Sequence, residues 1–295
     1  MDYGLNMVPA GLLPARKPDA HKGDFGRVFI VAGSKGMHGA AALCVQGCLR
    51  TGAGLVTLGL ARSLHDAMVQ KLPPEAMLKL LPDTKEGALA LGALPEIVSF
   101  ADKMDAVAIG PGLSQNAQTQ ELVREAVPKI VKPLVVDADG LNALAADPGI
   151  LKKRLLPCIL TPHAGEMGRL IRQSAEDVQR DRQRTAVEFA KKYQVVVVLK
   201  GQGTVVAAYD GRVYVNDTGN PGMASGGAGD VLTGVIAALL AQKLELFDAA
   251  RLGVYLHGLA GDLAAKERGD VGLLASDIAD RIPTAIRQYQ QLSAG

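Results

Sequence analysis

The chain has 295 residues, 48% of them hydrophobic and 21% charged, with 32 basic and 30 acidic side chains. This composition is typical of a soluble globular protein with enough apolar material for one large α/β domain or two small ones. Only 4% of the residues are aromatic, Trp is absent and the formal net charge is +2, which argues against a surface that stacks nucleic-acid bases.

The sequence carries few targeting or redox features. No charged-then-apolar N-terminal segment resembles a signal peptide, and no apolar run is long enough to span a membrane. The three cysteines, Cys44, Cys48 and Cys158, lack metal-binding spacing and are interpreted as buried thiols in a reducing compartment. We therefore expect a cytoplasmic protein that has neither a membrane nor a nucleic acid as a partner.

The first predicted elements follow an N-terminal arm. Residues 1–22 hold three prolines and little periodicity, so we assign them to an arm and residues 23–295 to a single domain. Residues 27–32 (RVFIVA) predict a buried strand, a glycine loop follows at 33–39, and a helix of small residues is predicted from residue 40 to 50. The loop reads GxxGxxG rather than GxGxxG, so it is either a close-packing turn or a loop whose amides face a substrate.

The rest of the chain continues to alternate strands with helices. The predicted strands are 55–60, 106–109, 134–136, 159–160 and 195–199, with a hairpin at 204–208 and 213–215; the predicted helices are 63–71, 117–127, 231–241, 249–265 and 276–289. Thr161 and Pro162 read as the N-cap and first residue of another helix, and the charged residues 179–184 as a solvated helix face. This alternation predicts an α/β fold with a mostly parallel central sheet and helices on both faces.

Suggestive loops follow five of the predicted strands, at residues 33–39, 110–112, 137–142, 163–166 and 200–204. In a parallel sheet these strand ends lie along one edge, where open α/β sheets bind ligands. Each loop alone is weak evidence, and each could be an ordinary turn. Their convergence predicts one active cleft.

A glycine-rich stretch at residues 216–234 is expected to join them there. Six of its nineteen residues are Gly, and it leads through Asp230 into an apolar helix. Free amides and the positive end of a helix dipole bind anions. A carboxylate beside bound phosphate is explained if it removes a proton from a hydroxyl while the amides hold the transferred phosphoryl group. The alternative is an N-capping Asp after a flexible loop.

Three carboxylates and one lysine loop complete the candidates. Asp137, Asp139 and Glu166 could ligate Mg²⁺, which prefers oxygen ligands, although each could equally be a turn or cap residue. Residues 200–204 (KGQGT) offer a cation, free amides and a hydroxyl for nucleotide phosphates, or form a plain turn between two strands. His163 on its own reads as an ordinary loop histidine.

The motif GNPGMASGGAGDVLTG at 219–234 resembles the anion-hole and catalytic-Asp motif of the ribokinase-like superfamily. Within it, the chain resembles the ADP/ATP-dependent NAD(P)H-hydrate dehydratases through further motifs at 23–41, 109–113, 135–144, 160–170 and 197–206. They occur in the family's order and span residues 23–286. Ser225 and Ala228 stand where the family often has Thr, and Ala228 lacks the hydroxyl.

The resemblance implies a ribokinase-like fold and a repair enzyme. Its substrates would be the S epimers of hydrated NADH and NADPH (NADHX and NADPHX), dehydrated at the expense of ADP or ATP with Mg²⁺. By motif, Ala40, Gly112, His163 and Asp230 would contact the hydrate; Lys200, Gly201, Gln202, Gly203, Thr204 and Gly229 the nucleotide; Gly226, Gly227, Ala228 and Gly229 would form the anion hole; and Glu166 would lie near the metal.

The resemblance also implies a homo-oligomer, a tetramer by family likeness, and we expect no fused epimerase domain. Two other functions remain open. A small-molecule kinase of the same superfamily would need the same Asp230, although the GPG and TPHAGE loops weigh against it. A non-catalytic nucleotide-binding protein would need no such base.

Overall fold

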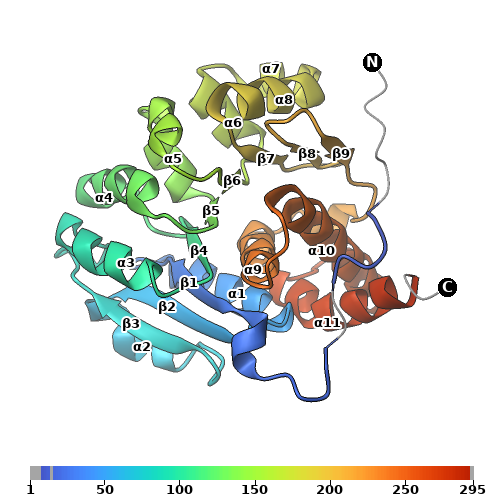
Figure 1. Ribbon diagram of the computed structural model, residues 1–295, viewed down its shortest axis with the longest axis horizontal. Helices are drawn as coiled ribbons and strands as arrows, with labels where there is room; N and C mark the ends of the chain where they lie inside the picture. The colour runs from blue at the N-terminus through green and yellow to red at the C-terminus, as the bar shows by residue number, and fades with distance from the viewer. Residues whose placement is uncertain (1–7, 14–15, 293–295) are drawn as a thin grey trace.

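The computed structural model describes residues 8–13 and 16–292, and a nine-stranded sheet forms its centre (Figure 1). The strand order is β3-β2-β1-β4-β5-β6-β7-β8-β9. The strands are β1 (Arg27–Val31), β2 (Leu55–Ala61), β3 (Met77–Leu81), β4 (Ala106–Ile109), β5 (Leu134–Val136), β6 (Ile159–Leu160), β7 (Val196–Leu199), β8 (Val205–Ala207) and β9 (Val213–Val215). Strands β1 to β7 are parallel, and β8 and β9 continue the sheet as an antiparallel hairpin.

Helices cover both faces of this sheet (Figure 1). One layer contains α1 (His38–Arg50), α9 (Ala228–Ala241), α10 (Leu246–Arg268) and α11 (Ala275–Leu292). The other contains α3 (Leu94–Ala101), α4 (Ala117–Lys129), α5 (Asp139–Ala145), α6 (Ala164–Ile171), α7 (Ala175–Arg180) and α8 (Arg182–Tyr193). A short helix, α2 (His65–Val69), lies between β2 and β3 along the chain. The inner strands are apolar throughout because both of their faces are buried.

Helix α9 is the central helix of its layer, and every residue from Val231 to Ala241 is buried. It approaches α1 closely, because a Cβ added to Gly234 would lie 2.0 Å from the Cys44 carbonyl oxygen and one added to Gly47 would lie 2.4 Å from that of Val231. Only glycine permits this contact. The packing fixes the start of α9 relative to the sheet edge.

Most of the predicted elements are confirmed, including the hairpin, the mostly parallel sheet and the three buried free cysteines. The predicted start of a helix at Thr161 and Pro162 is wrong: α6 begins at Ala164 with His163 as its N-cap. Strand β3 has no predicted counterpart, because its sequence MLKLL lies on an edge, is only partly buried and shows no clean alternation. Helix α3 also has none.

The N-terminal arm is described only in part. Within it, the Leu12 amide donates to the Tyr289 hydroxyl of α11 at 3.0 Å. The boundary at residue 22 stays a prediction. Among residues 8–13 and 16–292, no helix has the length and apolarity that crossing a membrane requires.

Candidate active site

The first turn of α9 contains the predicted base. The helix begins at Ala228, three residues earlier than expected, with Gly227 as a left-handed N-cap at φ 94°. A Cβ at Gly227 would lie 2.3 Å from Leu43 Cδ1, so the turn is sterically reserved for glycine. Asp230 is the third residue of the helix, beside the first amide groups, which have no acceptor within the helix. The predicted anion hole and the predicted base therefore lie in one turn.

Asp230 is only partly exposed. Its surroundings favour the protonated form of its carboxyl. Burial raises the pKa of its carboxyl to about 7, with further contributions from the negative charges of Asp137, Glu166 and Asp139, while the Lys200 ammonium acts in the opposite direction. A carboxyl with a pKa near 7 is well matched to proton transfer at neutral pH. This pKa is consistent with the predicted general base, which stays a prediction.

Lys200 lies in the same site, held by two carboxylates. Its Nζ is 2.8 Å from Asp137 Oδ1 and 3.8 Å from Glu166 Oε2. Although burial opposes its charge, these carboxylates raise the pKa of Lys200. The second oxygen of Asp137 accepts the Thr233 hydroxyl at 2.6 Å. Asp137 thus accepts a hydrogen bond on each of its oxygens.

His163 and Glu166 form a reciprocal cap at the start of α6. His163 Nδ1 accepts the amides of Gly165 and Glu166 at 3.0 and 3.3 Å, and the His163 amide donates to Glu166 Oε2 at 2.8 Å. The imidazole remains half exposed, whereas Glu166 is buried. His163 is joined to Lys200 by a parallel bridge between their backbones, so the ends of β6 and β7 meet here.

A second pair of predicted residues, Gly112 and Ala40, also comes together. A Cβ at Gly112 would lie 2.5 Å from the Met37 carbonyl oxygen and 3.0 Å from the Ala40 Cβ, and Gly112 has φ 61°. The Ser34 hydroxyl donates to the Gly112 carbonyl at 2.8 Å, and the Gly33 amide donates to Pro111 at 2.9 Å. The loops after β1 and β4 are therefore bonded to each other.

A cavity of about 680 Å³ opens between residues 200–204 and the start of α9. This volume falls in the usual range for a small-molecule site, about 300–1,000 Å³. Its lining includes the five predicted nucleotide-loop residues together with residues 216–221, Met223 and Gly229. On the α10 wall lies His257, whose burial lowers its pKa to about 4, so the ring is neutral.

Comparison with known proteins decides the family. A family model described as NAD(P)H-hydrate dehydratase matches residues 28–284. The chain belongs to the NAD(P)H-hydrate dehydratase family. The ADP-dependent (S)-NAD(P)H-hydrate dehydratase of Xanthomonas campestris is 37% identical over 272 residues, 92% of this chain and 91% of that protein.

A bifunctional NAD(P)H-hydrate repair enzyme of Moorella thermoacetica is 46% identical over 279 residues, 95% of this chain. The chain spans about half the length of the bifunctional relatives it matches, 52% in that case. The crystal structure of the ADP/ATP-dependent dehydratase of Bacillus subtilis, co-crystallised with ATP and Mg²⁺, has a TM-score of 0.77 at 34% identity and covers 94% of each chain. A ribokinase-like superfamily protein aligns with a TM-score of 0.78, which confirms the predicted fold class.

In this member of the dehydratase family, several residues that support the site were not predicted. Arg182, in the segment interpreted as a solvated face, donates to the carbonyls of Leu199, at 2.7 Å, and Gln202. It therefore holds the predicted nucleotide loop. No sequence signal distinguished it from its charged neighbours.

Helix α10 supports the glycine-rich loop in a similar way. Asp262 accepts the Gly219 amide and the Asn220 side chain, both at 2.9 Å. Cβ atoms at Gly258 and Gly261 would lie 2.2 Å from Thr218 Oγ1 and from Met223 Sδ. The spacing of these two glycines and Asp262 along one predicted helix was the available signal.

No group of three or more His, Cys, Asp or Glu side chains is arranged to hold a metal ion in the part of the chain that the structure describes. Mg²⁺ usually keeps several waters and takes one or two carboxylates plus substrate phosphates. Glu166 fits that arrangement, since its Oε1 lies 3.4 Å from the half-exposed His163 ring. Glu166 as a metal ligand stays a prediction, and Asp137 and Asp139 are engaged elsewhere.

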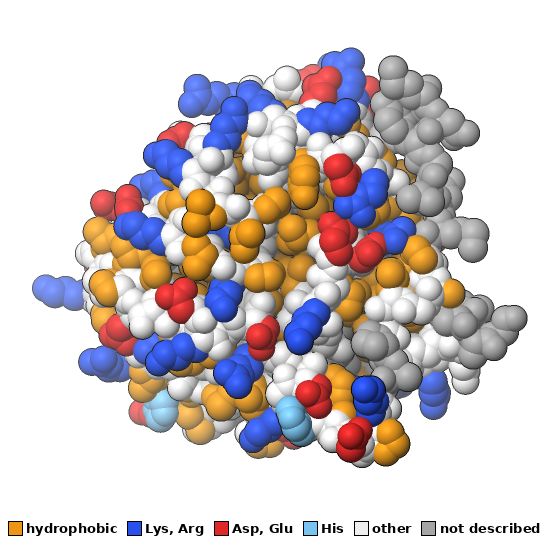
Figure 2. Space-filling view, in the orientation of Figure 1, with side chains coloured by type: hydrophobic (Ala, Val, Ile, Leu, Met, Phe, Trp, Pro, Cys, Tyr) orange, Lys and Arg blue, Asp and Glu red, His pale blue; other side chains and the backbone are white. Residues whose placement is uncertain are grey.

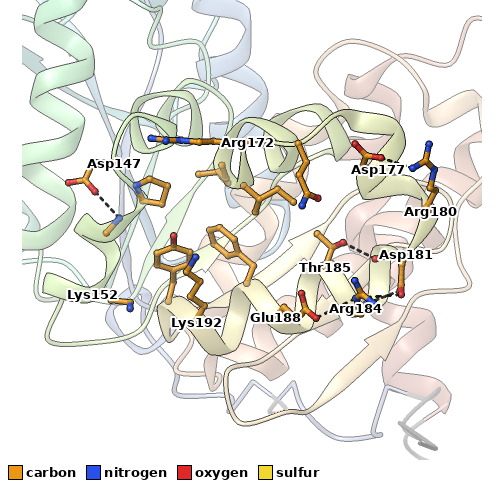
Figure 3. Close-up of a pocket in the computed structure, with 17 residues that line it drawn as sticks. Asp147, Lys152, Arg172, Asp177, Arg180, Asp181, Arg184, Thr185, Glu188 and Lys192 are labelled. Carbon is orange, nitrogen blue, oxygen red and sulfur yellow. Dashed lines mark hydrogen bonds and ion pairs between the residues drawn. The ribbon is translucent and has the colours of Figure 1, made fainter.

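A larger groove, of about 1,000 Å³, lies away from these residues between α6, α7 and α8 (Figure 3). Some of its charged side chains form exposed ion pairs: Arg180 with Asp177 at 2.7 Å, and Arg184 with Glu188 at 3.3 Å. On the face shown in Figure 2, basic and acidic side chains are likewise interspersed. Size alone therefore does not identify the site.

Proposed function

We propose that this chain dehydrates the S epimer of hydrated NADH or NADPH, using ADP or ATP as the phosphate donor. The observation that supports this most directly is the turn at the start of α9. In this turn a carboxyl with a pKa near 7 and the first helix amides lie next to the partly buried Lys200 ammonium, and both Gly229 and Lys200 line a nucleotide-sized cavity. The family membership supports the choice of substrate.

The proposed reaction begins with the ring hydroxyl of the hydrate. Asp230 takes the hydroxyl proton, and the oxygen attacks the terminal phosphorus of the nucleotide. The bond from that phosphorus to the bridging oxygen breaks, so that AMP leaves from ADP, or ADP from ATP. The amides of Gly226–Gly229 and the Lys200 ammonium stabilise the charge on the phosphoryl oxygens.

Phosphate then leaves with the C–O bonding electrons while the ring nitrogen donates its lone pair. Loss of a proton from the adjacent ring carbon restores the dihydronicotinamide. Phosphorylation is needed because hydroxide is a poor leaving group. Mg²⁺, when bound with the nucleotide and held by Glu166, supplies positive charge that offsets the phosphates.

In this proposal the two substrates would meet at Asp230. The hydrate would lie against Ala40, Gly112 and the exposed ring of His163, and the adenine nucleotide against residues 200–204 and Gly229. We further propose that the protein acts in the cytoplasm as a homo-oligomer, a tetramer by family resemblance.

The test is to incubate the protein with NADHX or NADPHX, Mg²⁺ and either ADP or ATP. The absorbance of the reduced nicotinamide should recover, with one phosphate released for each coenzyme restored. No recovery with either donor would reject the proposal. A stable phosphorylated product without phosphate release would instead identify a small-molecule kinase.

A further inference from the structure

Asp137 joins three parts of the chain that are far apart in sequence. It follows β5 and is only 1% exposed. Its two oxygens accept the Lys200 ammonium, 63 residues away, at 2.8 Å and the Thr233 hydroxyl, 96 residues away, at 2.6 Å. Lys200 follows β7, and Thr233 lies in the second turn of α9.

The lysine so held lies directly against the first turn of α9. A Cβ added to Gly229 would be 3.2 Å from Lys200 Nζ and 4.0 Å from Asp137 Oδ2. Gly229 is one residue before Asp230 and carries one of the predicted anion-hole amides. The Lys200 ammonium therefore lies beside the amide that would bind the oxygens of the transferred phosphoryl group.

Stability does not explain this arrangement. A buried ion pair commonly contributes no more to folding than apolar side chains of the same volume, because desolvation offsets the attraction. Here the negative charge of Asp137 also raises the pKa of the neighbouring Asp230. Both the desolvation of the ion pair and the repulsion between Asp137 and Asp230 oppose folding. Groups that oppose folding at a candidate active site indicate a functional role.

We infer that Asp137 is a positioning residue: it fixes the Lys200 ammonium and the first turn of α9 relative to each other, so that both meet the transferred phosphoryl group at once. The inference rests on the proposed function, because it takes the nucleotide phosphates to bind at residues 200–204. Asp137 itself contacts no reactant and acts through Lys200. Positioning of this kind lowers the barrier by holding the reacting groups in line.

The test is a double-mutant cycle with Asp137→Asn, Lys200→Met and the double variant, assayed with NADHX, ADP and Mg²⁺. Asp137→Asn should lower kcat roughly 10- to 100-fold, as small misplacements of reacting groups do. The KM for ADP should change less than about threefold, since the loss is confined to the transition state. In the Lys200→Met background, Asp137→Asn should lower kcat by no more than about threefold, because the ammonium that Asp137 positions is already absent.

Asp139→Asn is the matched control, two residues away. Its carboxylate accepts the Ser114 amide at 2.8 Å and the Asn142 side chain at 3.1 Å rather than the Lys200 ammonium. Its effect should add to that of Lys200→Met. Melting temperatures establish that each variant is folded. The double variant should recover stability that Asp137→Asn loses, because Lys200→Met removes the ammonium that Asp137→Asn leaves without its carboxylate.

The outcomes separate two failures. An inactive wild type would refute the proposed function and this inference with it. An active wild type whose Asp137→Asn variant keeps the wild-type kcat, or loses as much with Lys200→Met as without it, would overturn the positioning role alone. Should Asp137→Asn fail to fold, Thr233→Val removes one bond of the network, and it should lower kcat less when Lys200 is already Met.

Discussion

The start of α9 and the groove between α6, α7 and α8 are both rich in charge, but they differ in what surrounds that charge. In the groove, the Arg184 side chain is 73% exposed and pairs with Glu188 in water. Near the start of α9, Asp137 at the end of β5 is 1% exposed and Glu166 of α6 is 6% exposed, and both raise the pKa of Asp230. Water screens the first set and not the second, so only the second perturbs a neighbouring group strongly. Burial, rather than the size of a hollow, identifies the reactive region.

The largest expected effect is the loss of Asp230. Asp230→Asn should lower kcat by about 10²–10⁴-fold, the usual contribution of a general base, in the assay with NADHX and ADP. Retention of turnover above a tenth of the wild-type value would contradict the assignment of the base. Binding of ADP, measured by calorimetry, should persist.

The same substitution should stabilise the fold at neutral and alkaline pH. The pKa of Asp230 rises from its ordinary value of 3.8 to about 7 in the folded protein. The folded state therefore binds the proton more tightly than the unfolded state, and this stabilises the fold fully below about pH 4. The stabilisation is lost as the pH rises through 7. The Asn side chain has no charge to lose. Melting temperatures at pH 8 should therefore be higher for Asp230→Asn than for the wild type, with a smaller difference at pH 5. A large fall at pH 8 would favour a structural role.

Among substitutions in the loops that would contact the hydrate, Gly112→Ala should give the largest effect. The added methyl would lie 2.5 Å from the Met37 carbonyl oxygen, and the backbone there has φ 61°, so the loops after β1 and β4 must separate. We expect the KM for the hydrate to rise about tenfold or more, while the KM for ADP is less affected. Gly39→Ala, in the same region but with open space around the new Cβ, is the control and should behave as wild type.

The pH dependence follows from the same Asp230. A base must be ionised to act, so kcat/KM for the hydrate should fall about tenfold for each pH unit below 7. The control is the stability of the protein over the same range, which Asp230 itself does not reduce on acidification. A profile that stays flat from pH 7 to pH 5 would show that the base has an ordinary carboxyl pKa.

The sequence predicts the strands near the site well because they are short, fully buried apolar runs that end at a glycine or a polar residue. It also predicts that their loops converge, since parallel strands bring like ends together. It does not predict that Asp137 is bound by Lys200 and Thr233, because a contact across 63 and 96 residues has no local pattern. Local propensity also does not distinguish His163 from Thr161 as the N-cap of α6. His163 is the cap because its amide donates to the Glu166 carboxylate, which completes the capping box.

The smallest expected effects test the groove against the site with two arginines of α8. Arg184 is in the groove and mostly exposed, so Arg184→Gln should change the free energy of unfolding by less than about 0.5–1 kcal/mol, as for other surface ion pairs, and leave turnover unchanged. Arg182, two residues earlier, holds the carbonyls of Leu199 and Gln202. Arg182→Gln should raise the KM for ADP about fivefold, the equivalent of one hydrogen bond, since the nucleotide loop loses its support. Equal behaviour of the two variants in the ADP titration would mean that the loop at residues 200–204 does not bind the nucleotide, and that the contrast between the two regions is not a functional one.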